Sequence, residues 1–256
     1  MQVEGFALGE EQRIIVDWSK KGKNFFFTGN AGTGKTVTLI AVINGLRALL
    51  GSEAVAVSAS TGTAANLIGG QTIHSWAGVG LAAKSRYQLV ENIRANKTIL
   101  DRWITVKAIV IDEILLVTAD LFDKLEFIAR SVKGVNLPFG GIQLILSGDF
   151  HQLPPFLTAK AVQAETFCFT AHTWSRCIPL NIKLQQVWRQ KYPEYLLLLD
   201  GIRRGGDLNP TTLAILSLIT KADNNITDPI SKTWLYSKKR RVEEKTDNFL
   251  IMFLVK

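Results

Sequence analysis

Residues 29–36 read Gly-Asn-Ala-Gly-Thr-Gly-Lys-Thr, a spacing of glycines, lysine and threonine that suits phosphate chemistry. The pattern is G-x-x-x-x-G-K-T, in which glycines let the backbone curl and point consecutive N–H groups at phosphate oxygens. Lys35 would reach the β- and γ-phosphates, and the Thr36 hydroxyl would ligate Mg²⁺. We therefore predict a site for a nucleoside triphosphate; a glycine-rich turn is the weaker alternative. The predicted binding loop comprises Gly29, Asn30, Ala31, Gly32, Thr33, Gly34, Lys35 and Thr36.

Two acids that follow an apolar run supply a second part of this chemistry. Ile109-Val110-Ile111 precedes Asp112 and Glu113. Asp112 would hold the Mg²⁺ shell, and Glu113 would orient and deprotonate an attacking water. Acidic residues often end strands, so this pair alone is weak evidence for a site. The prediction becomes strong because the pair follows a phosphate loop in the sequence.

The segments around these residues alternate between strand and helix patterns. The apolar strand segments predict a parallel, doubly wound α/β sheet, because they are apolar on both faces. Ligands in such sheets bind at the carboxyl ends of the strands, where both motifs fall. Strands are predicted over residues 25–28, 54–59, 108–112 and 142–146, and helices over 37–50, 120–132 and 195–203. After Pro155 the alternation weakens.

Composition narrows the class of protein. The chain has 256 residues, 47% of them hydrophobic and 20% charged, as in a globular protein. Its net charge of +8 favours a polyanionic partner, with simple solubility as the alternative. Cys168 and Cys177 have neither metal nor redox spacing, which favours a reducing compartment. We find no secretory signal, no transit peptide and no apolar run long enough to cross a bilayer, so we expect no membrane partner.

The chain contains, in this order, segments 11–12, 29–36, 59–65, 72–78, 111–113, 121–126, 138–144, 148–155 and 188–190. In order and spacing these segments resemble the Pif-type (petite integration frequency) ATP-dependent 5′-to-3′ DNA helicases of superfamily 1B. The resemblance extends from Leu8 to about Arg204. It implies a RecA-like P-loop NTPase fold, with ATP and Mg²⁺ as cofactors and single-stranded DNA and DNA junctions as partners. Related helicase domains occur in Helitron transposons, so that origin stays open.

The resemblance also implies roles for single residues. Gln12 would read adenine, although by itself it is more typical of a surface residue. Gln152 would sense the γ-phosphate and relay its state to DNA. Arg189 would supply transition-state charge, since an arginine fork suits developing phosphate charge; the alternative is a surface arginine beside Trp188.

A DNA-facing set follows from the same resemblance. Hydroxyls and backbone N–H groups suit phosphate contacts that carry no sequence preference. Trp76 could add base stacking. For His74, a hydrogen-bonded structural histidine is the alternative. The resemblance places Pro154-Pro155 close to a base, but these prolines could simply end a strand. The set comprises Ser60, Thr61, Thr63, His74 and Ser75.

Two departures limit the predicted function. Leu115 stands where the family usually has a serine, so coupling of hydrolysis to DNA could be impaired. The chain ends at Lys256, before the family's later motifs. We therefore predict a motor domain over residues 1–205, and a linker with the start of a second domain over residues 206–256. In that second part, Lys238 to Arg241 is more typical of a solvated face than of a phosphate contact.

We therefore expect an amino-terminal fragment of an ATP-dependent DNA helicase that does not unwind DNA by itself. By resemblance it would serve DNA repair, recombination and telomere maintenance in the nucleus or mitochondrion. The alternatives are a module that binds nucleotide and single-stranded DNA without productive hydrolysis, and an unrelated ATPase such as a small-molecule kinase. The sequence specifies no oligomeric state.

Overall fold

The computed structural model describes residues 2–3, 6–152, 167–190, 192–205, 210 and 213–217. Contacts divide the chain into two units, Met1–Lys191 and Tyr192–Lys256. The residues of the predicted site lie in the first unit. The predicted boundary at residue 205 remains a prediction. Most of the predicted second domain, including Lys238 to Arg241, lies outside the described residues, as does Pro154-Pro155.

A six-stranded sheet organises the first unit, and all of its described strands are parallel. This confirms the predicted α/β class. The sheet also continues past Pro155, where the sequence pattern weakens, because β8 pairs with β3 from Phe25↔Leu180 to Gly29↔Leu184. Its strands, in spatial order, are β5 (Gln71–Thr72), β4 (Val55–Ala59), β6 (Ala108–Asp112), β7 (Gln143–Ser147), β3 (Phe25–Gly29) and β8 (Leu180–Leu184).

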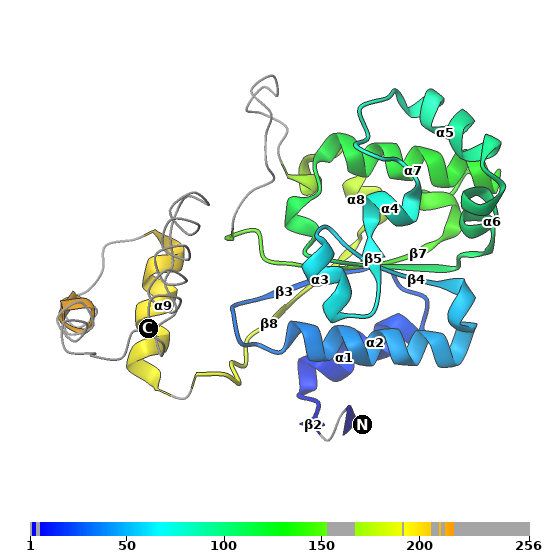
Figure 1. Cartoon of the computed structure of the whole chain (residues 1–256). Helices are drawn as coiled ribbons and strands as arrows, with labels where there is room; N and C mark the ends of the chain where they lie inside the picture. Colours follow the sequence, from blue (N-terminus) through cyan, green and yellow to red (C-terminus); the bar gives the residue numbers. More distant parts are fainter. Residues whose placement is uncertain are drawn as a thin grey trace, which may run out of the picture. The chain divides into compact units, whose positions relative to one another are not determined.

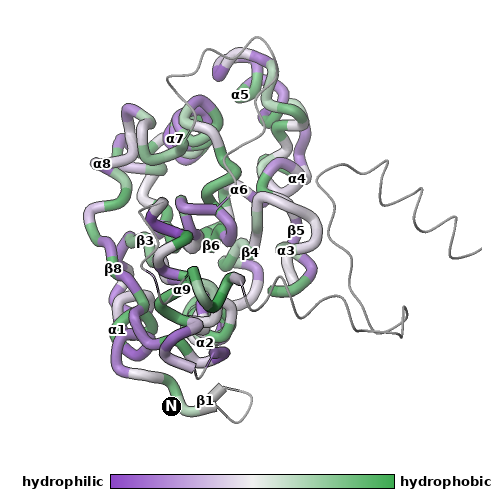
Figure 2. Tube along the Cα trace, turned by 90° about the vertical axis from the view of Figure 1, so that its left-hand side faces the viewer, coloured by the Kyte–Doolittle hydropathy of each residue, from purple (hydrophilic) through white to green (hydrophobic). Residues whose placement is uncertain are grey.

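Helices cover both faces of this sheet (Figure 1). Figure 2 shows α1 and α2 on one side of the strands and α5 and α7 on the other. The helices of the first unit are α1 (Glu10–Lys20), α2 (Lys35–Leu50), α3 (Gly62–Leu67), α4 (Ile73–Ala77), α5 (Arg86–Ala95), α6 (Lys97–Thr105), α7 (Ala119–Lys133) and α8 (Trp174–Cys177). Short 3₁₀ turns are η1 (Ser52–Ala54), η2 (Ile114–Leu116), η3 (Pro138–Gly141) and η4 (Cys168–Thr170). A small hairpin, β1 (Gln2–Val3) and β2 (Phe6–Ala7), precedes α1, and α9 (Pro193–Arg204) belongs to the second unit.

The core consists of two apolar layers, one on each side of the sheet. Alternate strand residues enter opposite layers: Ile109 packs with α5, α6 and α7, whereas Val110 packs with α1 and α2. This two-sided burial explains why the strands are apolar throughout. Cys168 and Cys177 are buried free thiols in the first of these layers, and burial raises the pKa of both.

Helix α7 illustrates how local sequence sets the elements. The Thr118 hydroxyl accepts a hydrogen bond from Leu121 N, and Gly134 ends the helix in the left-handed region at φ 66°. Between them, the predicted apolar stripe is buried. A capping hydroxyl at the start and a glycine at the end fix the helix to its observed length.

The carboxyl ends of four neighbouring strands determine where the site lies. β3 leads into the phosphate loop, β6 ends at Asp112, β7 leads to Gly148 and β8 leads to residues 185–190. Their parallel order brings all four connections to one edge of the sheet.

No helix among the described residues is long and apolar enough to span a membrane.

Candidate nucleotide and nucleic-acid site

The phosphate loop takes a shape that requires glycine at two positions. Gly32 and Gly34 lie in the left-handed region, at φ 84° and 81°. A Cβ on Gly32 would lie 2.8 Å from the Arg189 Cβ, and one on Gly34 would lie 2.7 Å from Gln12 Nε2. Side chains are therefore excluded both by backbone conformation and by close neighbours. Helix α2 begins within this motif, at Lys35.

Lys35 lies over the loop. Its Nζ donates to the carbonyl of Gly29 at 2.7 Å and to that of Asn30 at 3.3 Å. Thr33 is nearly fully buried and its hydroxyl donates to Asn30 O at 2.8 Å, so it shapes the loop from within. The predicted loop residues thus divide into those that build the cradle and those that face the cavity.

The two predicted acids have different environments. Asp112 is buried, 6% exposed, and burial raises the pKa of its carboxyl, while the charge of Lys35 acts in the opposite direction. Glu113 is less buried; its pKa is raised by burial and by the nearby charges of Asp112 and Asp149. Glu113 also has φ 50°, a conformation that a non-glycine residue adopts at a cost of about 1–3 kcal/mol. Such strain is typical of functional positions.

One cavity of about 540 Å³ joins the parts of the site. Lys35 and Thr36 line it beside Glu113, Gln152 and Arg189. The loop after β8 closes against the phosphate loop, because Trp188 N donates to Gly32 O at 2.8 Å. The complete lining is Ala31, Gly32, Gly34, Lys35, Thr36, Val37, Glu113, Gln152, Trp188 and Arg189.

Gln152 is positioned by a residue to which the sequence analysis gave no role. Asp149 is fully buried and accepts hydrogen bonds from Gln152 Nε2 at 3.2 Å and from His151 N at 3.1 Å. A carboxylate held inside the fold therefore orients the predicted sensor. The position of Asp149, two residues after the end of β7 and inside segment 148–155, was the available signal.

Gln12 is not the surface residue that its type alone suggested. It is 5% exposed, and its amide accepts from Gly9 N at 2.8 Å and donates to Thr38 Oγ1 at 3.0 Å. Gln12 Nε2 also approaches Gly34 O at 3.4 Å. The side chain thus joins the start of α1 to the phosphate loop. Its role toward adenine remains a prediction.

Part of the predicted DNA-facing set lies in an adjoining cavity of about 1100 Å³. Thr61 and Thr63 line it, and Glu113 and Gln152 line both cavities. Ser60 donates its hydroxyl to the carbonyl of Glu113 at 2.7 Å, so it contacts the strained acid directly. Apolar side chains make up much of the remaining wall: Ala64, Leu67, Leu115 and Leu116.

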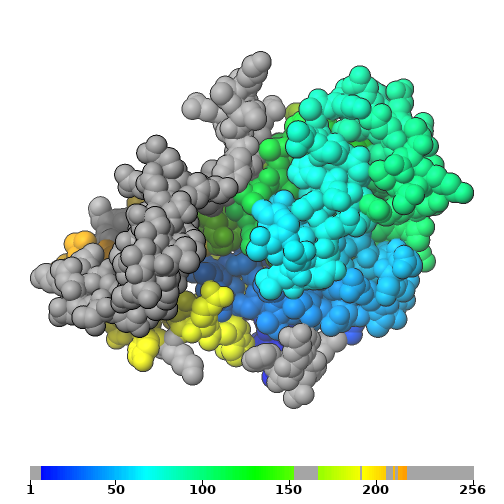
Figure 3. Space-filling model, in the orientation of Figure 1, coloured from blue at the N-terminus to red at the C-terminus, as the bar shows by residue number. Residues whose placement is uncertain are grey.

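The α4 part of the set lies apart from that lining. Figure 3 shows the surface that α3 and α4 form, in cyan, above the blue surface of α2. Ser75 is exposed and donates its hydroxyl to Gln71, whereas His74 is partly buried, which lowers its pKa. The prediction that Trp76 stacks on bases is wrong. Trp76 is 4% exposed and packs on Trp103 in the core, with ring centroids 4.7 Å apart.

Comparison with known proteins decides the family. The model of the PIF1-like helicase family matches residues 7–196. The chain belongs to the PIF1-like helicases. It is 42% identical over 236 residues to the ATP-dependent DNA helicase RRM3 of Saccharomyces cerevisiae, covering 91% of this chain and 32% of that protein. It is 43% identical over 198 residues to the human ATP-dependent DNA helicase PIF1, covering 77% and 30%. This chain therefore spans about a third of these relatives.

Solved structures of PIF1-like helicases match the fold. Pif1 helicase from Candida albicans superposes with a TM-score of 0.86 at 34% identity, covering 96% of this chain and 54% of that one. Pif1 from Bacteroides in complex with ADP-AlF3 and ssDNA gives a TM-score of 0.80 at 28% identity, covering 96% and 57%. The RecA-like fold that the resemblance implied is thereby confirmed.

Proposed function

We propose that this chain is the nucleotide-binding motor module of an ATP-dependent DNA helicase, which binds ATP with Mg²⁺ and couples its hydrolysis to single-stranded DNA. One observation carries the proposal: Lys35, Thr36, Glu113, Gln152 and Arg189 line one cavity beside a glycine cradle. These groups come from four separate connections of the sheet. A relative crystallised with ADP-AlF3 and ssDNA supports the same pair of ligands.

The residues present fit a magnesium ion. In the described part of the chain, no three His, Cys, Asp or Glu side chains gather where they could hold a metal. Mg²⁺ needs no such cage, because it usually takes one or two carboxylates and completes its shell with phosphate oxygens and water. The buried carboxylate of Asp112 and the Thr36 hydroxyl offer the hard oxygen donors it prefers. When bound, the ion would neutralise developing phosphate charge.

Each side chain then has a task in hydrolysis. Lys35 would hold the terminal phosphates, and Glu113 would orient the attacking water and take up its proton at the carboxylate. Arg189 would stabilise charge on the transferred group. Gln152, held by Asp149, faces the nucleotide cavity and the adjoining one, so it can report on phosphate to a strand bound along Thr61 and Thr63.

A module that binds without productive hydrolysis is the second candidate. Leu115 supports this candidate, because it stands where the resemblance implies a serine, and its side chain is 3% exposed and lies close to Gly148. Leu115 lines the adjoining cavity, and an apolar group there can neither donate nor accept a hydrogen bond. DNA binding would then leave the hydrolytic groups unchanged.

One variant tests the nucleotide site, and a second separates the two candidates. Lys35→Ala should abolish binding of a fluorescent ATP analogue with Mg²⁺, whereas Lys97→Ala, an exposed lysine on α6, should bind as the unaltered chain does. If Lys35→Ala bound the ATP analogue as tightly as the unaltered chain does, the proposed nucleotide site would be wrong. Turnover of ATP that rises with single-stranded DNA and disappears in Glu113→Gln would support the motor; binding of both ligands without such turnover would support the second candidate.

The cellular roles and the location of the protein are part of the same proposal. A DNA-dependent motor of this family would act in repair, recombination and telomere maintenance, and therefore in the nucleus or mitochondrion. Junctions as well as single strands would be its substrates. We further propose that this chain does not unwind DNA by itself, which a strand-displacement assay on a tailed duplex would test.

A further inference from the structure

A cavity of about 390 Å³ lies along the free edge of β4, and we call it the edge cavity. Residues 55–57 form one of its walls, and Arg47 of α2 and Arg102 of α6 also line it. The neighbouring strand β5 covers this edge of β4 only from Ser58 onward. The edge cavity therefore lies at the end of β4 opposite to Ser60 and the nucleotide site.

Two backbone groups at this edge have no strand partner. Ser60 N donates to Asp112 O at 3.1 Å, so the even-numbered residues of β4 bond to β6. Because backbone groups alternate along a ladder, Val55 and Val57 point to the other edge. Val55 N is used locally, by Ser52 O. Among the described residues, Val57 N–H and Val55 C=O are thus left unpaired, although both residues are buried. Buried backbone groups are nearly always paired, so this donor and acceptor mark a place for a ligand.

The two arginines add unpaired positive charge. Arg47 Nε is buried without a hydrogen-bond partner, and in the described part of the chain Arg47 forms no ion pair. Arg102 uses Nη1 to donate to the carbonyls of Trp76 and Ser75, at 2.8 and 3.3 Å, which fixes its guanidinium. Glu53 is the one acid among the described residues of this lining, and it is exposed. The edge cavity therefore favours an anion.

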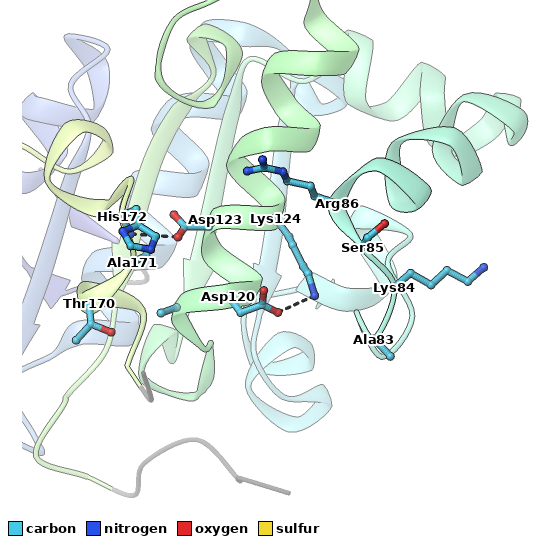
Figure 4. Close-up of a pocket in the computed structure, with 11 residues that line it drawn as sticks. Ala83, Lys84, Ser85, Arg86, Asp120, Asp123, Lys124, Thr170, Ala171 and His172 are labelled. Atoms are coloured by element: carbon cyan, nitrogen blue, oxygen red, sulfur yellow. Dashed lines mark hydrogen bonds and ion pairs between the residues drawn. The ribbon is translucent and has the colours of Figure 1, made fainter. Parts of the chain in front are cut away.

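A second cavity, of about 630 Å³ between α5, α7 and residues 170–172, provides a contrast (Figure 4). There Asp120 pairs with Lys124 at 2.7 Å, and Lys124 Nζ also donates to Ala82 O at 2.8 Å. Asp123 accepts from His172 N at 3.1 Å. These acids are compensated within the protein, whereas Arg47 in the edge cavity has no counter-charge of this kind.

The spacing of the two backbone groups selects an extended chain that ends inside the edge cavity. In a parallel ladder one residue donates to the residue before its neighbour and accepts from the residue after it. A residue opposite Ala56 would therefore use Val55 O and Val57 N. The next position is closed, because Gly70 lies so near that a Cβ on it would overlap Val57 O. A strand that enters beside β4 must end opposite Ala56.

We propose that the edge cavity binds the free carboxyl terminus of a partner protein. The terminal residue donates its N–H to Val55 O, and its carboxylate accepts from Val57 N–H and from the guanidinium groups of Arg47 and Arg102. A phosphate group of DNA would meet the arginines but has no donor for Val55 O. This contact is independent of the proposed motor function.

The side chain of the terminal residue is specified by the same geometry. Neighbouring residues in a parallel ladder point to the same face of the sheet. The terminal side chain would therefore share the face of Ala56, whose layer of the core includes Trp76 and Val106, and both of these line the edge cavity. An apolar terminal residue such as valine fits this wall.

Three forms of one peptide test the proposal. The probe is a fluorescent heptapeptide that ends in Thr-Ser-Val with a free carboxylate, and its binding is measured by anisotropy without nucleotide. The same peptide with a terminal amide should bind at least about tenfold more weakly, because it loses the charge that the arginines bind. A peptide with N-methylated terminal valine should also bind more weakly, because it lacks the donor for Val55 O.

Arginine variants test the protein side of the contact. Arg47→Met should bind the free acid about tenfold more weakly and lose most of the preference for acid over amide. Arg13→Met is the matched control, since Arg13 is an exposed arginine of α1 with no ion pair among the described residues, and it should bind as the unaltered chain does. Thermal unfolding of each variant is measured in parallel, and the three peptides test the unaltered chain whatever the variants do.

Several results would overturn the proposal. They are equal binding of acid and amide, unchanged binding by Arg47→Met, and no binding of the free acid up to about 1 mM. Displacement of the peptide by an equal concentration of inorganic phosphate or of a thymidine oligonucleotide would also overturn it, because the edge cavity would then be a phosphate site. Since no nucleotide is present, none of these results bears on the motor proposal.

Discussion

Replacing Gly32 by alanine tests whether the phosphate cradle is built for a ligand. The substitution places a side chain at φ 84°, which costs about 1–2 kcal/mol for a residue with a Cβ. Gly51, at the end of α2, provides the control, because its φ is 86° but a Cβ there would meet nothing within 4 Å. Gly51→Ala should therefore lose stability through backbone strain alone, whereas Gly32→Ala adds the cost of its close contacts; each kcal/mol lowers the melting temperature by about 2–4 °C in a domain of this size.

The two variants should differ in nucleotide binding. A Cβ on Gly32 would lie 2.8 Å from both the Arg189 Cβ and Gln190 Oε1, where ordinary contact begins at 3.4 Å. The backbone must move, and Gly32 O is bonded to Trp188 N. Loss of one N–H bond to a charged phosphate costs about 1.5–3 kcal/mol, or roughly ten- to a hundredfold in affinity.

The assay is a titration with a fluorescent ATP analogue and Mg²⁺, with thermal unfolding measured in parallel. Gly32→Ala should bind at least about tenfold more weakly, and Gly51→Ala should bind as the unaltered chain does. Normal binding by Gly32→Ala would refute the reasoning, because the cradle would then tolerate a side chain. Equal loss in Gly51→Ala would also refute it, since the loss would reflect stability alone.

Three further predictions follow from the site and its support. Leu115→Ser should raise the stimulation of ATP turnover by single-stranded DNA several-fold, measured as a ratio of rates; an unchanged ratio would contradict a role in coupling. Because burial lowers the pKa of His74, it is neutral near pH 7, and acidification adds positive charge. Binding to DNA should therefore strengthen as the pH falls, and less so in His74→Gln, where an identical pH profile would exclude a phosphate contact. Glu126 is fully buried and accepts from Arg130 and Arg176, both at 2.7 Å. Glu126→Ala should lower the free energy of unfolding by about 1–3 kcal/mol in urea, and no change would show that the two partly exposed arginines rehydrate without cost.

Much of the first unit could be predicted from local sequence. The strand predicted over 108–112 is observed at those bounds, and the helix predicted over 120–132 extends by one residue at each end. Both signals are local: an apolar run covered on two sides, and a helical stripe between a capping threonine and a glycine. The phosphate loop could also be predicted from local sequence, because its glycines and its lysine all lie within residues 29–36.

Other elements gave weaker signals. The α1 helix, the α5 and α6 pair and strand β8 were absent from the sequence prediction. In β8, exposed and intermediate residues alternate until the buried Leu184, so its pattern is not that of a two-sided core strand. It joins the sheet at an edge, where one side lacks a partner strand.

By itself, the sequence determined that this chain carries a phosphate loop, an acid pair and a parallel α/β sheet. Only the tertiary structure decided which residues meet. It buried Trp76 against Trp103, joined Ser60 to Glu113 and placed Asp149 behind Gln152. It also brought Arg189 over Gly32. The physical reason is distance along the chain: burial and hydrogen-bond partners between separate strands depend on strand order, which no local pattern encodes.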